Sequence, residues 1–198
     1  MPEFAQHVLE SLRQPLEDGR VSIARAGGVG HFPARFQLVG AANPCRRGCP
    51  SLDRCVCTPA ERARYLGRLS RPLLDRIDLH VEMPAVAHAD LQLPAGEPSR
   101  AVRARVVAAR ERQRERFRTG RTNAEMSPRL VRRACGLDAL AARLLAAAMT
   151  RLGLSARAHD RVLKVARTIA DLEGAAAIRA EHVAEAVQHR GLDRPWRP

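Results

Sequence analysis

The chain has 198 residues, of which 45% are hydrophobic, so it is long enough to bury a core in one domain or two small ones. Aromatic residues make up only 3% of the sequence, and a core built from aliphatic side chains favours helices. No apolar run approaches the ~20 residues that span a bilayer, and the N-terminus lacks the features of a signal peptide. We therefore expect a cytoplasmic protein with no membrane contact.

The formal net charge is +13, which favours a polyanionic partner such as nucleic acid. Nearly all of the basic residues are arginines, since Lys164 is the only lysine, and alanine is abundant. This composition indicates a general bias toward arginine and alanine. Any single arginine is therefore weaker evidence of a functional role than usual. A merely solvated basic surface therefore remains the alternative to nucleic-acid binding.

The first part of the chain is predicted to mix helix and strand. Apolar residues at helical spacing predict a helix over residues 2–17. Residues 21–23 alternate apolar and polar side chains, and the glycines of residues 27–30 can reverse the chain, which together predict a hairpin. The apolar run 36–42 is typical of a buried strand, and it ends at Asn43.

The remainder of the chain is predicted to become entirely helical after a linker. A short helix is expected over residues 61–69 and a strand over 77–81. Residues rich in Pro, Ala and Gly then indicate a linker. Helices are expected at 101–117, 137–152, 155–173 and 180–188. In the third of these, Ser155 is the expected N-cap and Gly174 ends the helix. The predicted division is therefore 1–84, a linker over 85–99, and a helical domain over 100–198.

Four of the five cysteines lie within thirteen residues, with the spacing C-x3-C-x5-C-x-C. They are Cys45, Cys49, Cys55 and Cys57. In a reducing compartment such a cluster favours a tetrahedral zinc site over disulfides. The spacing differs from the usual pair of C-x2-C knuckles, so free thiols remain the alternative. Cys135 stands alone in a helical region and is expected to pack as a small apolar residue.

Several segments, taken in order, resemble the ComM type of magnesium-chelatase-like AAA+ ATPases. Residues 12–26 resemble the segment after the Walker B acids, and 32–45 resemble the sensor 1 strand. Residues 73–79 resemble the arginine-finger segment, and residues 153–158 together with 165–172 resemble the sensor 2 helix. The resemblance covers nearly the whole chain. It implies an α/β plus all-α fold: the C-terminal half of an AAA+ core, with an incomplete parallel sheet and a hairpin insert, followed by a helical lid bundle.

The resemblance assigns three residues to a nucleotide site that binds ATP and Mg²⁺. Asn43 would orient the attacking water as sensor 1, and Arg76 would be the arginine finger that reaches the neighbouring subunit's γ-phosphate. Arg157 would be sensor 2 in the first turn of its helix. The alternatives are an Asn-Pro turn, an arginine paired with Asp75 or Asp78, and an ordinary basic helix face.

The resemblance also implies a hexameric ring that moves DNA, with a role in branch migration during natural transformation. The hairpin would then be a pore loop whose tip contacts DNA phosphates without sequence specificity. The candidate DNA residues are Arg25, Gly27, Gly28 and His31. A plain connecting hairpin is the alternative.

The sequence contains no G-x-x-x-x-G-K-[ST] motif, and no acidic pair closes a strand ahead of Pro2. The resemblance thus implies a chain that starts just after the magnesium-holding residues and does not hydrolyse ATP alone. Two other readings remain open. One is a small basic zinc protein that binds nucleic acid and has no ATP role. The other is a non-functional truncated product or a misassigned start.

Overall fold

The computed structural model describes residues 1–49, 54–86, 88–94 and 96–191, and these divide into two compact units. The first unit comprises residues 1–77 and 82–85, and the second comprises 78–81 and 86–191. The predicted domain boundaries at 84 and 99 stay a prediction, and the end of the predicted helical domain, 192–198, lies outside the described residues.

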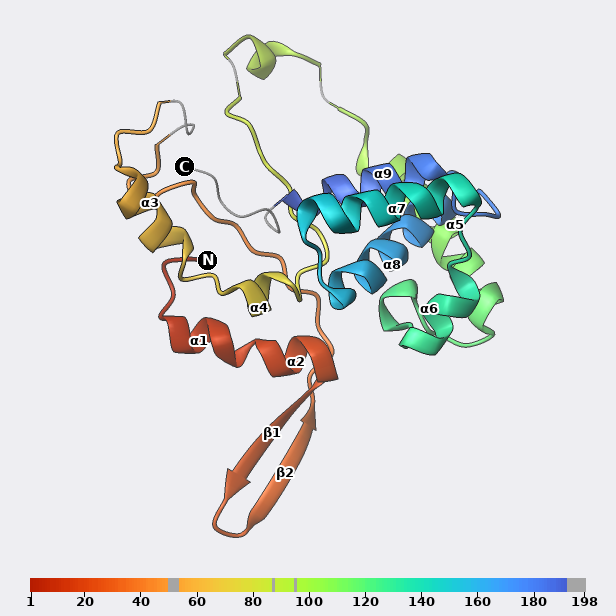
Figure 1. Cartoon of the computed structure of the whole chain (residues 1–198), viewed down its shortest axis with the longest axis horizontal. Helices are drawn as coiled ribbons and strands as arrows, with labels where there is room; N and C mark the ends of the chain where they lie inside the picture. The colour runs from red at the N-terminus through yellow and green to blue at the C-terminus, as the bar shows by residue number, and fades with distance from the viewer. Residues whose placement is uncertain (50–53, 87, 95, 192–198) are drawn as a thin grey trace. The chain divides into compact units, whose positions relative to one another are not determined.

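The first unit contains short helices and one hairpin (Figure 1). Its elements are α1 (Gln6–Ser11), α2 (Arg13–Asp18), β1 (Arg20–Arg25), β2 (Gly28–Pro33), α3 (Pro59–Leu66) and α4 (Arg71–Leu74). The single helix predicted over 2–17 is thus two helices that meet at Leu12. Gly19 ends α2 in the left-handed conformation, with φ 64°, which glycine adopts without steric cost.

The predicted hairpin is confirmed. Strands β1 and β2 pair antiparallel, with Arg20 opposite Pro33 and Arg25 opposite Gly28, so that a two-residue turn joins them. Gly28 has φ 133°, a conformation that side-chain-bearing residues rarely adopt. Figure 1 shows the hairpin extending away from α1 and α2, and most of its residues are exposed.

The other two predicted strands do not form in this chain, and the described residues contain no parallel sheet. Residues 36–42 and 77–81 form no strand, and the hairpin is the only sheet among the described residues. A strand needs a neighbouring strand that satisfies its backbone N–H and C=O groups, and neither segment lies beside one in the described chain. Their apolar side chains are consequently exposed, Val39 by 84% and Val81 by 62%.

A small apolar cluster joins the helices of the first unit. Leu9, Leu69 and Leu73 are buried and contact one another. Leu73 is fully buried, which stabilises the unit by roughly 2 kcal/mol. The short helix α4, which the sequence analysis did not predict, begins at an N-cap, because the Ser70 hydroxyl accepts a hydrogen bond from the Leu73 N–H at 3.3 Å.

The second unit is helical. Its elements are η1 (His88–Gln92), α5 (Ser99–Phe117), η2 (Asn123–Glu125), α6 (Pro128–Ala134), α7 (Ala139–Leu152), α8 (Ala156–Glu173) and α9 (Ala180–Gln188). The predicted helix limits for α8 are confirmed: the Ser155 hydroxyl accepts from the Ala158 N–H at 3.1 Å, and Gly174 ends the helix with φ 85°. The unpredicted helices are short, α6 with seven residues and η2 with three.

Helix α8 lies at the centre of the second unit, in contact with α5, α6 and α9. Its buried residues Val162, Leu163 and Ala166 belong to the main apolar core, together with Val183 from α9. The core uses Ala, Val, Leu and Ile, as the low aromatic content predicted. Cys135 is part of it, which confirms that this cysteine packs as an apolar residue, and burial raises the pKa of its thiol to about 11.

A buried polar network fixes α5 and η2 to α8. The carboxylate of Asp171 is fully buried and accepts hydrogen bonds from Arg116 at 2.9 Å and from Asn123 at 2.8 Å. It also pairs with Arg167 at 3.1 Å. Arg167 donates in addition to the Ala175 carbonyl at 2.7 Å. Buried charges of this kind are tolerated only when partners satisfy them.

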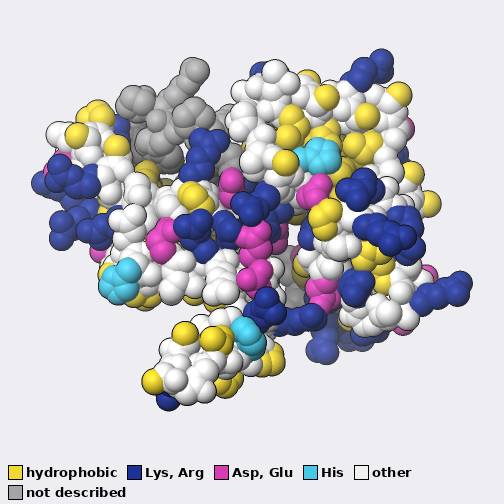
Figure 2. All heavy atoms as spheres, turned by 60° about the horizontal axis from the view of Figure 1, so that its bottom comes forward, with side chains coloured by type: hydrophobic (Ala, Val, Ile, Leu, Met, Phe, Trp, Pro, Cys, Tyr) yellow, Lys and Arg dark blue, Asp and Glu magenta, His cyan; other side chains and the backbone are white. Residues whose placement is uncertain are grey.

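The surface is rich in arginine, in keeping with the net charge. On the face viewed in Figure 2, basic side chains are spread over the surface and acidic ones are fewer. None of the helices in the described ranges is both long enough and apolar enough to cross a bilayer.

Candidate functional site

The four clustered cysteines come together in space. Cys45 and Cys49 come from the loop after Asn43, and Cys55 and Cys57 lie directly before α3. Their sulfur atoms all lie within 4.8 Å of one another. Cys45 and Cys57 are buried, while the other two are partly exposed. The sequence spacing therefore predicted a real cluster, although its two halves are separated along the chain.

This donor set fits a tetrahedral metal. Four sulfurs at about 2.3 Å from a zinc ion would be separated by about 3.8 Å, so the observed cluster needs little contraction to hold one. The Cys49 N–H donates to the Cys45 sulfur at 3.4 Å. This bond, together with hydrogen bonds from the neighbouring thiols, lowers the pKa of the Cys45 thiol to about 6. One ligand is thus prepared as a thiolate, the form that binds metal.

Helix α3 anchors the second half of the cluster. Thr58, next to Cys57, is its N-cap: the Thr58 hydroxyl accepts from the Glu61 N–H at 3.2 Å, and the Glu61 carboxylate accepts from the Thr58 N–H at 2.8 Å. This capping box holds the backbone at Cys57 in a fixed position. Burial raises the pKa of the Cys57 thiol to about 12, so a metal would have to displace its proton.

Asn43, the candidate sensor 1 residue, is exposed and lies two positions before Cys45. It stands in irregular backbone rather than at the end of a strand, because residues 36–42 form none. Cys45 is completely buried. A metal bound to its sulfur would therefore fix the backbone two residues after the Asn43 side chain. The cluster and the sensor candidate therefore belong to one local structure.

Arg76, the candidate finger, follows α4 and forms an ion pair with Glu17 of α2. It also donates to the Pro72 carbonyl at 2.7 Å. The structure thus gives Arg76 a partner that the sequence did not predict, while Asp78 pairs with Arg161 instead. Glu17 precedes Gly19 by two residues, and no sequence signal connects it with residue 76.

Arg157, the candidate sensor 2 residue, belongs to the second unit and lies in the first turn of α8, where it is exposed. Further along α8, Arg161 pairs with Asp78, and Lys164 donates to the Ala124 carbonyl at 2.9 Å. Burial lowers the pKa of Lys164. Arg161 and Lys164 therefore both have partners within the second unit.

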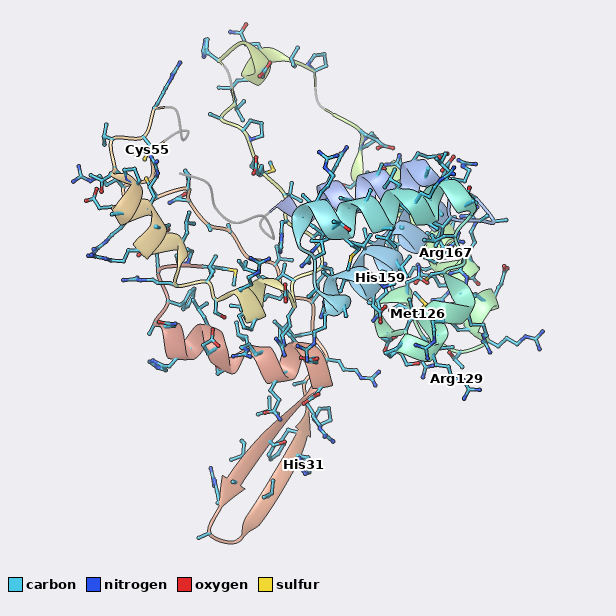
Figure 3. The ribbon with its side chains drawn as sticks, viewed as in Figure 1. His31, Cys55, Met126, Arg129, His159 and Arg167 are labelled. Carbon is cyan, nitrogen blue, oxygen red and sulfur yellow. The ribbon has the colours of Figure 1, made fainter. Side chains whose placement is uncertain are left out.

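The candidate DNA residues lie on the hairpin. Arg25 and Gly28 face each other at its tip, and Gly27 is in the turn. His31 accepts or donates a hydrogen bond with the Ser22 hydroxyl at 2.9 Å across the two strands, and Figure 3 shows it on the hairpin. All four candidate DNA residues are exposed to solvent.

The hairpin and the four-cysteine cluster lie within the match of one family model, and the helical bundle lies within the match of a second. The family model described as magnesium chelatase, subunit ChlI, matches residues 1–91, and the model of the ChlI C-terminal domain matches residues 96–190. The chain belongs to this magnesium chelatase ChlI-like family, which confirms the resemblance drawn from the sequence.

Among individual relatives, the competence protein ComM of Haemophilus influenzae is 45% identical over 98% of the chain. The YifB protein of Escherichia coli is 42% identical over the same share, and Rv2897c of Mycobacterium tuberculosis is 44% identical over 95%. The chain spans 38% of the length of each of these relatives.

Proposed function

We propose that this chain forms the sensor and arginine-finger part of a ring-shaped AAA+ ATPase that acts on DNA. The observation that carries the proposal is the match of the ChlI family model over residues 1–91, because that stretch includes both Asn43 and Arg76. The name of one relative, competence protein ComM, connects that relative with competence. Branch migration of DNA during natural transformation is the proposed activity of the intact protein.

In this proposal the chain supplies the groups that respond to a nucleotide, and another part of the intact protein supplies the P-loop and the acids that hold Mg²⁺. Asn43 orients the attacking water, and Arg157 adds positive charge at a helix N-terminus. Residues 36–42 and 77–81 then pair with strands of that other part as the sheet of an AAA+ core. Their exposed apolar side chains, such as Val39 and Leu79, support this.

Arg76 would act on the nucleotide of the neighbouring subunit, which requires that its guanidinium exchange Glu17 for phosphate oxygens. The guanidinium presents the same forked donors to a carboxylate and to a phosphate, so this exchange is chemically matched. Glu17 holds the side chain in one orientation until the neighbouring subunit presents a nucleotide.

The test is a chimera in which this chain replaces the corresponding C-terminal part of a full-length relative. We expect Mg²⁺-dependent ATP hydrolysis that DNA stimulates. Arg76→Ala should lower kcat by about a thousandfold, the usual effect of losing an arginine finger, and Asn43→Ala should lower it strongly without changing ATP binding. Arg129→Ala is the matched control, because Arg129 is an exposed arginine on α6. Equal rates for Arg76→Ala and this control would show that Arg76 is not the finger.

The cysteine cluster favours a second candidate, a zinc-containing nucleic-acid-binding protein with no ATP role. It requires DNA binding by the isolated chain that depends on the cysteines and ignores nucleotide. A chimera with no ATPase activity, together with such binding, would favour it over the first proposal.

A further inference from the structure

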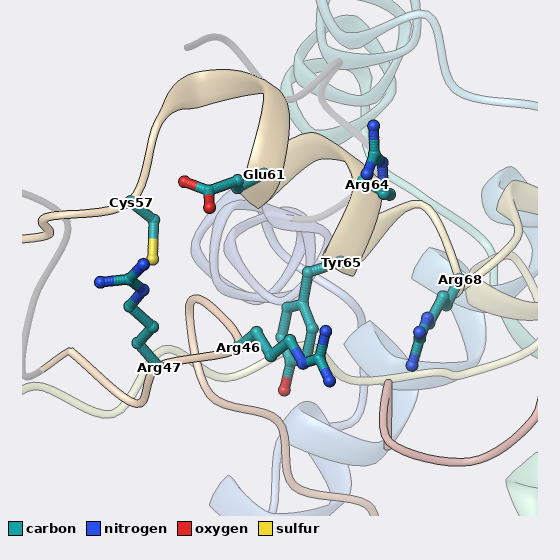
Figure 4. A pocket seen from close by; sticks show the side chains of 7 residues that line it. All are labelled: Arg46, Arg47, Cys57, Glu61, Arg64, Tyr65 and Arg68. Atoms are coloured by element: carbon teal, nitrogen blue, oxygen red, sulfur yellow. The ribbon is translucent and has the colours of Figure 1, made fainter.

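A hollow beside the cysteine cluster is lined mainly by arginine. It has a volume of about 440 Å³ and lies between the cysteine loop and α3 (Figure 4). Its lining residues are Arg46, Arg47, Cys57, Glu61, Arg64, Tyr65 and Arg68. No sequence motif connects these arginines, since residues 46–47 and 64–68 are separated in the sequence.

The charge of the hollow is not neutralised from within. Glu61 is its only acidic lining residue, and its carboxylate already accepts hydrogen bonds from the N–H and, at 3.0 Å, the hydroxyl of Thr58. Within the part of the chain that the structure describes, Arg46, Arg47 and Arg64 form no hydrogen bond or ion pair. The four guanidinium groups also outnumber the negative charges of Glu61 and a zinc–tetrathiolate centre taken together.

The shape and polarity of the hollow select a phosphate rather than a base. Tyr65 is only 5% exposed, so it offers no open ring face on which a base could stack. Guanidinium groups bind phosphate oxygens through paired hydrogen bonds. Contacts of this kind hold a nucleic-acid backbone without reading its sequence.

The cysteine cluster determines where these arginines lie. Arg46 and Arg47 occupy the loop between Cys45 and Cys49, and Arg64 is in the last turn of α3, which begins just after Cys57. A metal bound by all four thiolates would therefore fix the arginine loop against the helix. Without the metal, the loop is held near α3 only by weak hydrogen bonds between the thiols and by the attraction between Arg47 and Glu61.

We propose that this hollow is a phosphate-binding site for the backbone of a nucleic acid and that metal binding by the four cysteines assembles it. The inference rests on the proposed action on DNA and adds a second contact region, separate from the hairpin tip. The ligand is the phosphodiester group of DNA. Free phosphate shares this chemistry, and competition by inorganic phosphate distinguishes it from a nucleic-acid backbone.

The experiment measures binding of a labelled single strand and a labelled duplex to the full chain by fluorescence anisotropy at several salt concentrations. The double variant Arg46→Glu/Arg47→Glu should weaken binding about tenfold or more and reduce the salt dependence, the slope of log K against log[salt], by about two. The control Arg129→Glu/Arg132→Glu makes the same change in net charge on α6, whose exposed Arg129 is labelled in Figure 3. It should leave the slope within about half a unit of the unmodified chain.

Two further arms keep the test decisive. Arg64→Glu removes a positive charge that α3, rather than the cysteine loop, contributes to the hollow. It should reduce the slope of log K against log[salt] by about one. It therefore detects the site even if the double variant fails to bind zinc. After complete removal of zinc by a chelator, the unmodified chain and the double variant should bind equally. A difference that persists without zinc overturns the metal coupling.

The remaining outcomes separate this proposal from the proposed function. DNA binding that the hollow variants alter no more than the control overturns the site but leaves the action on DNA intact. Absence of any DNA binding by the full chain and by the chimera overturns both. Displacement of the oligonucleotide by millimolar inorganic phosphate at constant ionic strength would identify a small-anion site and overturn the assignment to a nucleic-acid backbone.

Discussion

The most quantitative prediction concerns Asp171, whose buried carboxylate connects α5, η2 and α8. Replacing it by Asn keeps the volume but removes the negative charge between Arg116 and Arg167. Arg167 is 3% exposed and would keep only its bonds to backbone carbonyls, such as that of Ala176 at 2.9 Å. Removing one partner of a buried ion pair costs about 3–5 kcal/mol.

For a unit of roughly 100 residues this cost corresponds to a decrease in Tm of about 15–25 °C, because the unfolding entropy is about 0.2 kcal/mol per kelvin. The assay is thermal unfolding followed by far-UV circular dichroism, with urea unfolding as a second measure of the free energy. Asp160→Asn is the control on the same helix, since the Asp160 side chain is 36% exposed and pairs with His159 at the surface at 3.1 Å. It should change stability by less than about 0.5 kcal/mol. A loss below about 1 kcal/mol for Asp171→Asn would refute the account of the network.

Three further predictions concern the first unit. The purified chain should hold one zinc ion, measured by elemental analysis after anaerobic preparation. Cys57→Ser should lower the zinc content markedly, whereas the control Cys135→Ser should not. A wild-type chain without zinc would contradict the metal centre. Zinc affinity should fall as pH is lowered through neutrality. The Cys57 thiol has a pKa of about 12, so its proton must leave when zinc binds. An affinity that does not change with pH in a competition titration would contradict this. Leu73→Ala should destabilise the first unit by about 2–5 kcal/mol in urea unfolding, because Leu73 is fully buried, whereas the exposed Leu91→Ala should have little effect.

The helices of the second unit could be predicted because their signals are local. Ser155 and Gly174 fix the ends of α8 by hydrogen bonding and by a left-handed backbone, and both are recognisable within a few residues of sequence. The same holds for the glycines of the hairpin. By contrast, residues 36–42 have the composition of a buried strand, but a strand forms only beside another strand, and the sequence of the segment alone does not tell whether one is present.

The part of the candidate site whose residues lie close together in the sequence could be predicted. The spacing of the cysteines within thirteen residues indicated a cluster, and the structure brings their sulfurs together. The pairing of Arg76 with Glu17 and the arginine-lined hollow could not be predicted, because each depends on contacts between segments that are distant in sequence. In a chain with so many arginines, no single one carries a signal until its neighbours are known.

The central claim is that this chain completes a nucleotide site on the neighbouring subunit of a ring. The most direct measurement mixes two inactive chimeras, one with Arg76→Ala and one in which the P-loop lysine of the relative is replaced. The account predicts that mixed rings recover ATP hydrolysis, because an intact P-loop then meets an intact Arg76 across a subunit boundary. No recovery, although the two chimeras assemble together, would contradict it.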